Sequence, residues 1–221
     1  EEMLDDARKD LENLAEDLGV RAKGKLTIET RVEIGTVVNQ IKEFSNQENP
    51  FAVVFGTHGK TALERFLLGS NSLSAIKHLH VPVLIIPDQY RFVPITRIGL
   101  ASDLAFSQAF SRKVPYWRIT EWLSSFNASL DIVHVSKSEH PKYEDLSESI
   151  SVEHQLYKFH PAVHFLTGSN LQEKLAEFAK ERQLDLLIIV PQHHGIEDLF
   201  VERHAKKIIL NQRIPVLSLH A

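Results

Sequence analysis

The sequence contains no cysteine, and this absence removes several classes of protein at once. Without thiols the chain has no disulfide scaffold, no thiolate zinc site and no cysteine nucleophile. An excess of positive charge is also missing, because 25 Lys+Arg stand against 29 Asp+Glu for a formal net charge of −4. A general nucleic-acid binder needs a basic face to neutralise phosphates, so the composition disfavours that class.

Long hydrophobic runs are absent as well. The longest, at residues 81–87 and 186–191, fall far short of the roughly 20 apolar residues that a membrane-spanning helix needs. No secretory signal is visible, and the lack of cysteine is consistent with the cytoplasm, where we expect this protein. The sequence starts at Glu1 without a methionine, so the natural N-terminus can lie upstream.

The composition that is present is that of a globular protein. Of the 221 residues, 43% are hydrophobic and 24% charged, which is enough for a sizeable core. Helix-type and strand-type patterns alternate along the chain, and several strands are continuous apolar runs, as in strands buried on both faces of a sheet. This alternation predicts an α/β fold with a parallel sheet covered by helices on both faces.

The predicted elements follow from these patterns. Helices are expected at residues 3–18, from the cap residue Thr36 to about residue 44, and at 70–80, 114–126, within 143–159, 171–182 and 201–210. Strands are expected at residues 25–34, 51–55, 82–86, 97–101, 130–135, 162–166, 185–190 and 215–219. Residues 88–94 are polar and flanked by prolines, and we interpret them as a linker.

The two sides of this linker repeat each other. Phe51–Gly59 resembles Leu187–Gly195, and Val81–Pro87 resembles Ile214–His220. A duplicated domain explains this, with a first half at 1–90 and a second half at 91–221. The second half carries a strand, a helix and a strand within 95–140 that the first half does not match. We therefore expect the first domain to be incomplete, with a corresponding block ahead of Glu1.

The segment richest in glycine follows the strand predicted at 51–55. It reads Gly56-Thr-His-Gly59-(nine residues)-Gly69-Ser70-Asn71-Ser72. Glycines at a strand end let an anion approach the backbone, because no Cβ intervenes. The start of the next helix offers free N–H groups and a positive dipole end, and Ser70 and Ser72 add hydroxyl donors.

At these residues the sequence resembles the universal stress protein family, whose nucleotide-binding members carry G-x2-G-x9-G-(S/T). The resemblance extends to HVPVLIIP (His80–Pro87) and to ETRVEIG (Glu29–Gly35), and it covers both halves. It implies a tandem member with two open, Rossmann-like parallel-sheet domains. It further implies ATP or AMP in the first half, possibly with Mg²⁺. Gly56, Gly59, Gly69 and Ser70 would hold the phosphates, with Asn71 and Ser72 as neighbours.

The second half departs from the family pattern. The family uses an acidic residue at the end of its first strand to hold the ribose, and the counterpart here is Asp103. Aligning Pro82 with Pro215 places Glu202 over Gly69 and Arg203 over Ser70, and only Gly195 keeps its place. Since a carboxylate repels phosphate, we expect no nucleotide in the second half.

The last strand of each half is expected to pair within the chain. In this family such strands pair antiparallel across a two-fold axis, so Val83–Ile86 and Val216–Leu219 would form an intrachain pseudo-dimer. The alternative is a homodimer between chains through other surfaces, and further homodimerisation is compatible with either arrangement.

For several residues a purely structural role is the alternative to a functional one. The glycines can merely form a tight turn, His58 and Lys60 can be surface residues, and Asp103 can be a cap. The 12 histidines include the adjacent pair His193–His194, but no H-x3-H or HExxH spacing indicates zinc, so we expect no metal site. Trp117 and Trp122 share one helix and are interpreted as core or interface residues.

The leading hypothesis is a stress-response protein that binds ATP as a regulatory ligand. The second is an interaction protein without nucleotide, acting through its pseudo-dimer and an unknown protein partner. The third, an enzyme such as a slow ATPase, is disfavoured because no Walker lysine motif, HxGH-like signature or general base is evident. We therefore expect no catalytic residues, and neither nucleic acid nor membrane as a partner.

Overall fold

The computed structural model describes residues 2–57, 70–88, 90–103, 114–136, 152–167, 170–190 and 213–219. It divides into two compact units, Glu1–Phe44 and Ser45–Ala221. We call them the N-terminal unit and the sheet unit, and describe each by itself.

The N-terminal unit contains helix α1 (Glu2–Arg21) and most of α2 (Val37–Glu48), whose last residues belong to the sheet unit. Helix α1 carries Glu2 and Asp5 in its first turn and Arg21 in its last, which suits the helix dipole. No described residue of α1 is buried. Helix α2 begins after Thr36, as predicted, and the backbone N–H of Gln40 donates to the Thr36 carbonyl at 3.1 Å.

The prediction of a strand at residues 25–34 is wrong. The structure assigns neither strand nor helix there. In the second half, the corresponding strand β5 (Ala162–Thr167) lies in a ladder with β4 (Ser129–Ser136). A strand exists only through hydrogen bonds to a neighbour, and the described part of the N-terminal unit contains no strand to pair with.

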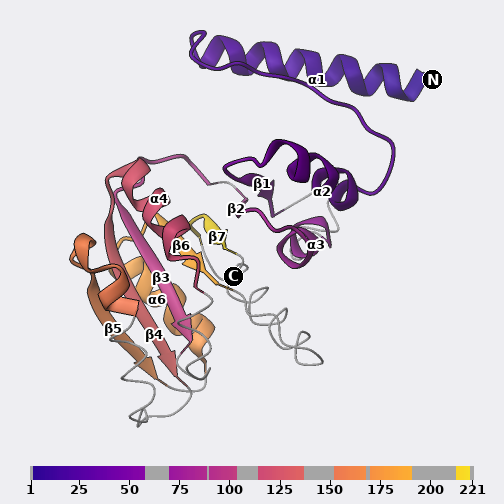
Figure 1. Cartoon of the computed structure of the whole chain (residues 1–221). Helices are drawn as coiled ribbons and strands as arrows, with labels where there is room; N and C mark the ends of the chain where they lie inside the picture. The colour runs from indigo at the N-terminus through magenta and orange to yellow at the C-terminus, as the bar shows by residue number, and fades with distance from the viewer. Residues whose placement is uncertain are drawn as a thin grey trace. The chain divides into compact units, whose positions relative to one another are not determined.

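The sheet unit is built on seven strands (Figure 1). Besides β4 and β5 they are β1 (Val53–Gly56), β2 (Val83–Ile86), β3 (Arg97–Asp103), β6 (Leu186–Ile189) and β7 (Val216–Ser218). Their order across the sheet is β1-β2-β7-β6-β3-β4-β5. All neighbours are parallel except β2 and β7. The predicted α/β fold with a mainly parallel sheet is confirmed.

The antiparallel pair joins the two halves of the chain. Val83 lies opposite Ser218, Leu84 opposite Leu217 and Ile85 opposite Val216. The predicted pairing of the two last strands within one chain is therefore confirmed. Because both halves share one sheet, compactness alone does not test the division at residues 90 and 91, which stays a prediction.

In the described part of the sheet unit, the strands are flanked by helices α3 (Ser70–His78), α4 (Tyr116–Phe126) and α6 (Leu171–Glu181). A short 3-10 helix, η2, covers Tyr157–Phe159. Of the helix predicted within 143–159, the structure describes residues 152–155 as helical. The helix predicted at 201–210 lies outside the described residues.

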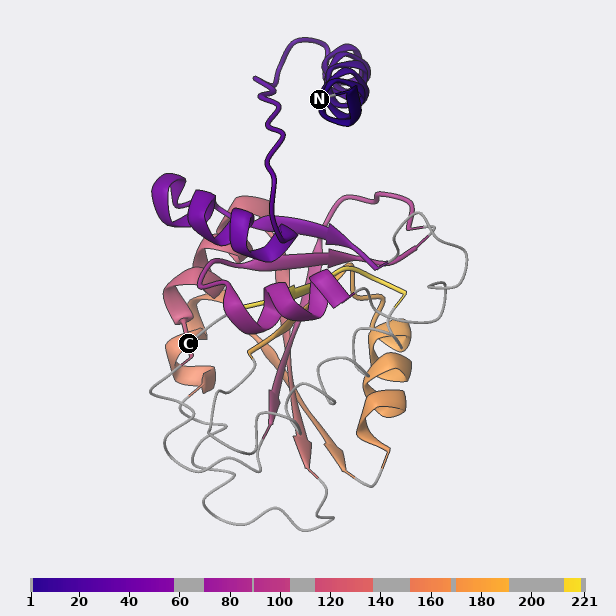
Figure 2. The same cartoon turned by 90° about the vertical axis from the view of Figure 1, so that its right-hand side faces the viewer.

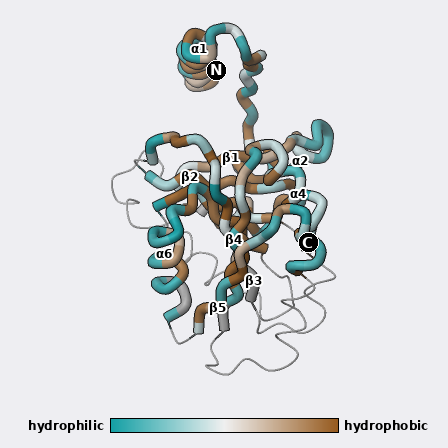
Figure 3. Tube along the Cα trace, turned by 90° about the vertical axis from the view of Figure 1, so that its left-hand side faces the viewer, coloured by the Kyte–Doolittle hydropathy of each residue, from teal (hydrophilic) through white to brown (hydrophobic). Residues whose placement is uncertain are grey.

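One apolar cluster of buried residues lies between α4 and the sheet. Ile119, Trp122 and Leu123 of α4 pack with buried residues of β3, β4, β6 and β7. Ala52 and Leu84, from the first half, pack against the same cluster. Figure 3 shows hydrophobic residues along the strands of the sheet unit.

The two tryptophans of α4 have different environments. Trp122 is 3% exposed, and its ring stacks on Phe51 with centroids 4.8 Å apart. Trp117 is 63% exposed and lies against the Arg118 guanidinium, 4.1 Å from the ring centroid. Trp122 is thus a core residue that contacts the first half, whereas Trp117 lies on the surface.

Candidate functional site

The described part of the glycine motif lies where β1 ends and α3 begins. Gly56 is the last residue of β1, and Ser70, Asn71 and Ser72 open α3. Gly59 and Gly69 lie outside the described residues, as do His58 and Lys60.

A side-chain hydrogen bond joins the two ends of this motif. The Ser72 hydroxyl donates to the Gly56 carbonyl oxygen at 3.0 Å, and Ser72 is only 2% exposed. This contact uses the hydroxyl proton of Ser72 to hold the helix start against the strand end. Asn71, by contrast, is exposed. Ser72 therefore positions the site, which differs from the direct donor role suggested by the sequence.

Thr57 joins the ends of β1 and β2 and was missed by the sequence reasoning. Its backbone N–H donates to the Ile86 carbonyl at 3.1 Å, and its Oγ1 accepts the backbone N–H of Asp88 at 3.0 Å. Thr57 is 5% exposed. The available signal was its place directly after Gly56, where a residue that continues the ladder can anchor the turn.

This arrangement favours the binding of an anion at the ends of β1 and β2. Two parallel strands, β1 and β2, end side by side, and the nine-residue helix α3 starts against the end of β1. The first turn of α3 contains no acidic residue, so nothing there opposes the positive end of its dipole. Ligands of open α/β sheets bind at such carboxyl ends of strands.

The second half offers fewer described residues at the corresponding place. Asp103 ends β3, and its Cα lies opposite that of Val135 on β4. Gly195, Glu202 and Arg203 lie outside the described residues. The expected failure of this half to bind nucleotide therefore stays a prediction.

A buried carboxylate organises the opposite edge of the second-half strands, near the start of β4. Asp131 is 1% exposed, and its Oδ2 lies 3.1 Å from Arg97 Nε. Its Oδ1 lies 2.9 Å from Arg182 Nη2 and 2.8 Å from His164 Nε2. These pairs tie β3, β4, β5 and the end of α6 together. Such a carboxylate is stable in the interior because two guanidinium groups compensate its charge.

A second carboxylate reinforces the same edge. Asp185 Oδ2 accepts hydrogen bonds from the backbone N–H of Thr96 at 2.8 Å and of Arg97 at 3.0 Å. Both carboxylates are engaged in holding strand starts, so we assign this cluster a structural role. Sequence reasoning did not identify it, although Asp131 is a charged residue between the apolar Leu130 and Ile132 of a predicted strand.

His134 is a buried histidine whose pKa is shifted by its surroundings. It is 0% exposed, and its ring lies 5.3 Å from the Phe165 ring, centroid to centroid. Neither ring nitrogen has a hydrogen-bond partner among the described residues. Burial lowers the pKa of His134 to about 4, because the charged imidazolium would lose its hydration. The side chain is thus neutral near pH 7.

The described residues contain neither a cluster of metal-ligating side chains nor a membrane-spanning helix. That part of the chain contains no group of three or more His, Cys, Asp or Glu residues able to hold a metal ion. His193 and His194 lie outside it. In the same described ranges, no helix combines the length and apolarity required to cross a membrane.

Comparison with known proteins finds matches to one family. Residues 1–87 match the model of the universal stress protein family. A universal stress protein of Methanocaldococcus jannaschii is 40% identical over 81 residues, which are 37% of this chain and 44% of that protein. One from Mycobacterium tuberculosis is 24% identical over 213 residues, covering 90% of this chain and 70% of the relative.

A solved structure agrees with these sequence matches at the level of the fold. The crystal structure of a universal stress protein from Archaeoglobus fulgidus superposes with a TM-score of 0.70 at 20% identity, over 99% of this chain and 77% of that one. Residues 1–87 therefore match the universal stress protein family, and a universal stress protein aligns along 90% of the chain. The fold of the chain is shared with a solved universal stress protein.

Proposed function

We propose that this protein binds ATP or AMP in its first half, through Gly56, Gly59, Gly69 and Ser70, as a regulatory ligand in a stress response. The observation that carries the proposal is the 3.0 Å hydrogen bond from Ser72 to the Gly56 carbonyl. It brings the two ends of the glycine motif together, although they are far apart in the sequence.

The physical support is electrostatic and steric. The N-terminus of α3 offers unpaired backbone N–H groups, which bind phosphate oxygens well. Gly56 has no side chain to fill the approach, and Thr57 holds the ends of β1 and β2 in register. Mg²⁺ would accompany a triphosphate by neutralising part of its charge.

Binding would act on the conformational equilibrium rather than through turnover. At a ligand concentration a hundredfold above Kd, the bound state gains about 2.7 kcal/mol of stability. That gain is enough to select which surface is presented to a protein partner. We propose that ATP hydrolysis is at most slow, since no nucleophile or general base was identified. A cytoplasmic location stays a prediction.

The test is titration calorimetry of the full-length protein with ATP and AMP, beside the Gly69→Glu variant. This substitution copies Glu202 of the second half and introduces a charge that repels phosphate. We expect about one nucleotide per chain for the unaltered protein and none for the variant. Gly19→Glu in α1 is the matched control, because a side chain there meets nothing within 4 Å and adds the same charge.

Absence of binding by the intact protein would contradict the proposal and leave the glycines as turn residues. The second candidate, an interaction protein without nucleotide, would then take precedence. One observation favours it: the N-terminal unit exposes large apolar side chains, with Met3 at 82%, Ile34 at 77% and Val20 at 72% exposure. Circular dichroism of both variants must first show an unchanged fold.

A further inference from the structure

The antiparallel pairing of β2 with β7 places the start of β7 beside the proposed nucleotide site. In a parallel pair, two strands end at the same edge of the sheet, as β1 and β2 do. In an antiparallel pair, the end of one strand adjoins the start of the other. The chain entering β7 therefore lies next to the end of β2. In Figure 2 the yellow start of β7 lies close to the arrowheads of β1 and β2.

The register identifies the residue concerned. Ile85 lies opposite Val216 in the β2·β7 ladder. Asp88 follows Ile85 by three residues and Arg213 precedes Val216 by three, so the same register, continued past the ends of both strands, would bring Asp88 level with Arg213. Each of these two segments is also bonded to its other neighbour in the sheet. The Asp88 N–H donates to Thr57 Oγ1, and the Leu187 N–H donates to the Pro215 carbonyl. Arg213 thus enters the edge formed by Gly56, Thr57 and Asp88.

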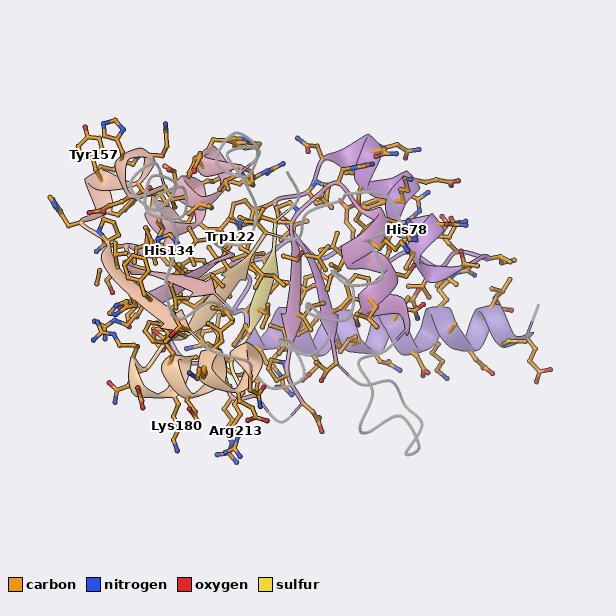
Figure 4. All side chains as sticks on the ribbon, turned by 90° about the horizontal axis from the view of Figure 1, so that it is seen from below. His78, Trp122, His134, Tyr157, Lys180 and Arg213 are labelled. Atoms are coloured by element: carbon orange, nitrogen blue, oxygen red, sulfur yellow. The ribbon has the colours of Figure 1, made fainter. Side chains whose placement is uncertain are left out.

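Arg213 differs from the other arginines of this edge. Arg97 and Arg182 are both held by the buried Asp131 carboxylate. Arg213 is exposed and makes no ion pair with any residue that the structure describes. Figure 4 shows its side chain pointing away from the ribbon. Since β1 lies two strand spacings from β7, about 10 Å, a long side chain from Arg213 can meet a ligand bound over the ends of β1 and β2.

We propose that Arg213 binds the phosphate groups of the nucleotide held by the first half. The inference rests on the proposed function of that site and adds a residue from the second half, whose own glycine motif is degenerate. The planar guanidinium donates paired hydrogen bonds to phosphate oxygens and keeps its charge at every physiological pH. Asp88 is the carboxylate at the same level, and a phosphate chain outcompetes it for Arg213 by carrying more negative charge. A triphosphate therefore gains more from Arg213 than a monophosphate does.

The test compares Arg213→Gln and Arg213→Lys with the unaltered full-length protein by calorimetric titration of ATP, AMP and adenosine. Arg213→Gln weakens ATP binding about tenfold, as expected for the loss of a charged hydrogen-bond donor, and AMP binding two- to threefold. Adenosine binding is unchanged. The ATP affinity of Arg213→Lys lies between those of the unaltered protein and of Arg213→Gln, because lysine keeps the charge and loses the paired hydrogen-bond geometry. Lys158→Gln is the control, since it removes the same charge beside β5, at the far side of the sheet.

The outcomes separate this proposal from the one it rests on. Weaker ATP binding in Arg213→Gln, with Lys158→Gln unchanged and equal melting temperatures, supports Arg213 as a phosphate ligand. Unchanged ATP affinity in Arg213→Gln overturns the role of Arg213 and leaves the first-half site standing. Equal losses for ATP, AMP and adenosine also overturn it, because they indicate a general change of the site. Absence of nucleotide binding by the unaltered protein overturns both proposals together.

Discussion

At the scale of single residues, His134 shows how burial alone changes chemistry. The imidazole is fully buried, without a hydrogen-bond partner among the described residues, and beside the Phe165 ring. An isolated charge in such a place costs several kcal/mol, so the proton leaves instead. The consequence is a dependence of stability on pH.

We expect the free energy of unfolding to fall as the pH drops through the window from 6.5 to about 4. In that window the unfolded chain binds a proton that the folded chain does not, so acid favours unfolding. A shift from 6.5 to about 4 corresponds to roughly 3 kcal/mol, lost fully below pH 4. Urea unfolding at several pH values measures this slope.

The matched variants are His134→Phe and His160→Gln. His134→Phe keeps a planar ring beside Phe165 and removes the titrating group, so its stability should vary less between pH 4 and 6.5. His160→Gln is the control, because it replaces an exposed histidine elsewhere in the second half. An identical slope in His134→Phe would show that other groups cause the acid sensitivity.

At the scale of elements, helix α4 covers the sheet of the second half and also reaches the first half. Trp122 stacks on Phe51, which precedes β1, and its ring lies 5.7 Å from Phe126, centroid to centroid. Figure 4 shows Trp122 among the ribbons of the sheet unit. One side chain of α4 therefore links elements from both halves.

We expect Trp122→Ala to lower the free energy of unfolding by about 3–5 kcal/mol, because it removes a large buried ring and leaves a cavity. Trp117→Ala is the control on the same helix. It loses an exposed contact with Arg118, which is worth about 0.5–1 kcal/mol. Thermal unfolding followed by circular dichroism measures both. Similar losses for the two variants would contradict the assignment of Trp122 to the core.

At the scale of the whole molecule, the β2·β7 ladder makes one sheet from two repeated halves. Both tryptophans lie on α4 in the second half, so tryptophan fluorescence reports the surroundings of that helix, which include Phe51 of the first half. Ile85 is 1% exposed on β2, in the first half. If the shared sheet unfolds as a unit, a destabilising substitution at Ile85 must lower the unfolding midpoint that tryptophan fluorescence reports.

We expect Ile85→Ala to lower the stability reported by tryptophan fluorescence by about 2–4 kcal/mol. Val54→Ala on β1 should change it by less than about 0.5 kcal/mol, because Val54 is 61% exposed. Guanidinium unfolding, followed by fluorescence and by circular dichroism, provides the two midpoints. A fluorescence midpoint unaffected by Ile85→Ala would show that the halves unfold independently.

Local patterns predicted most of the strands and helices of the sheet unit. Continuous apolar runs such as 82–86 and 186–190 correspond to β2 and β6, because strands buried on both faces leave no polar positions. The same reasoning failed at 25–34. There the pattern was suitable for a strand, but the described unit offers no neighbouring strand to complete its hydrogen bonds.

The candidate site was predicted in part. The spacing from Gly56 to Ser70 indicated a strand end followed by a helix start, and the structure places these two ends in contact through Ser72. The bond from Asp88 to Thr57 and the cluster around Asp131 were not predictable. They join residues 31 and 51 positions apart, and no local pattern encodes which of many polar residues will meet.

The sequence by itself determined the alternation of elements, the internal repeat and the glycine motif, because each depends on residues that are close along the chain. Only the tertiary structure decided that β7 runs antiparallel to β2 in a particular register. Continued past the ends of both strands, that register carries the inferred position of Arg213 beside Asp88. Register is a property of two distant strands packed together, and it arises only when their buried faces and hydrogen bonds are satisfied at once.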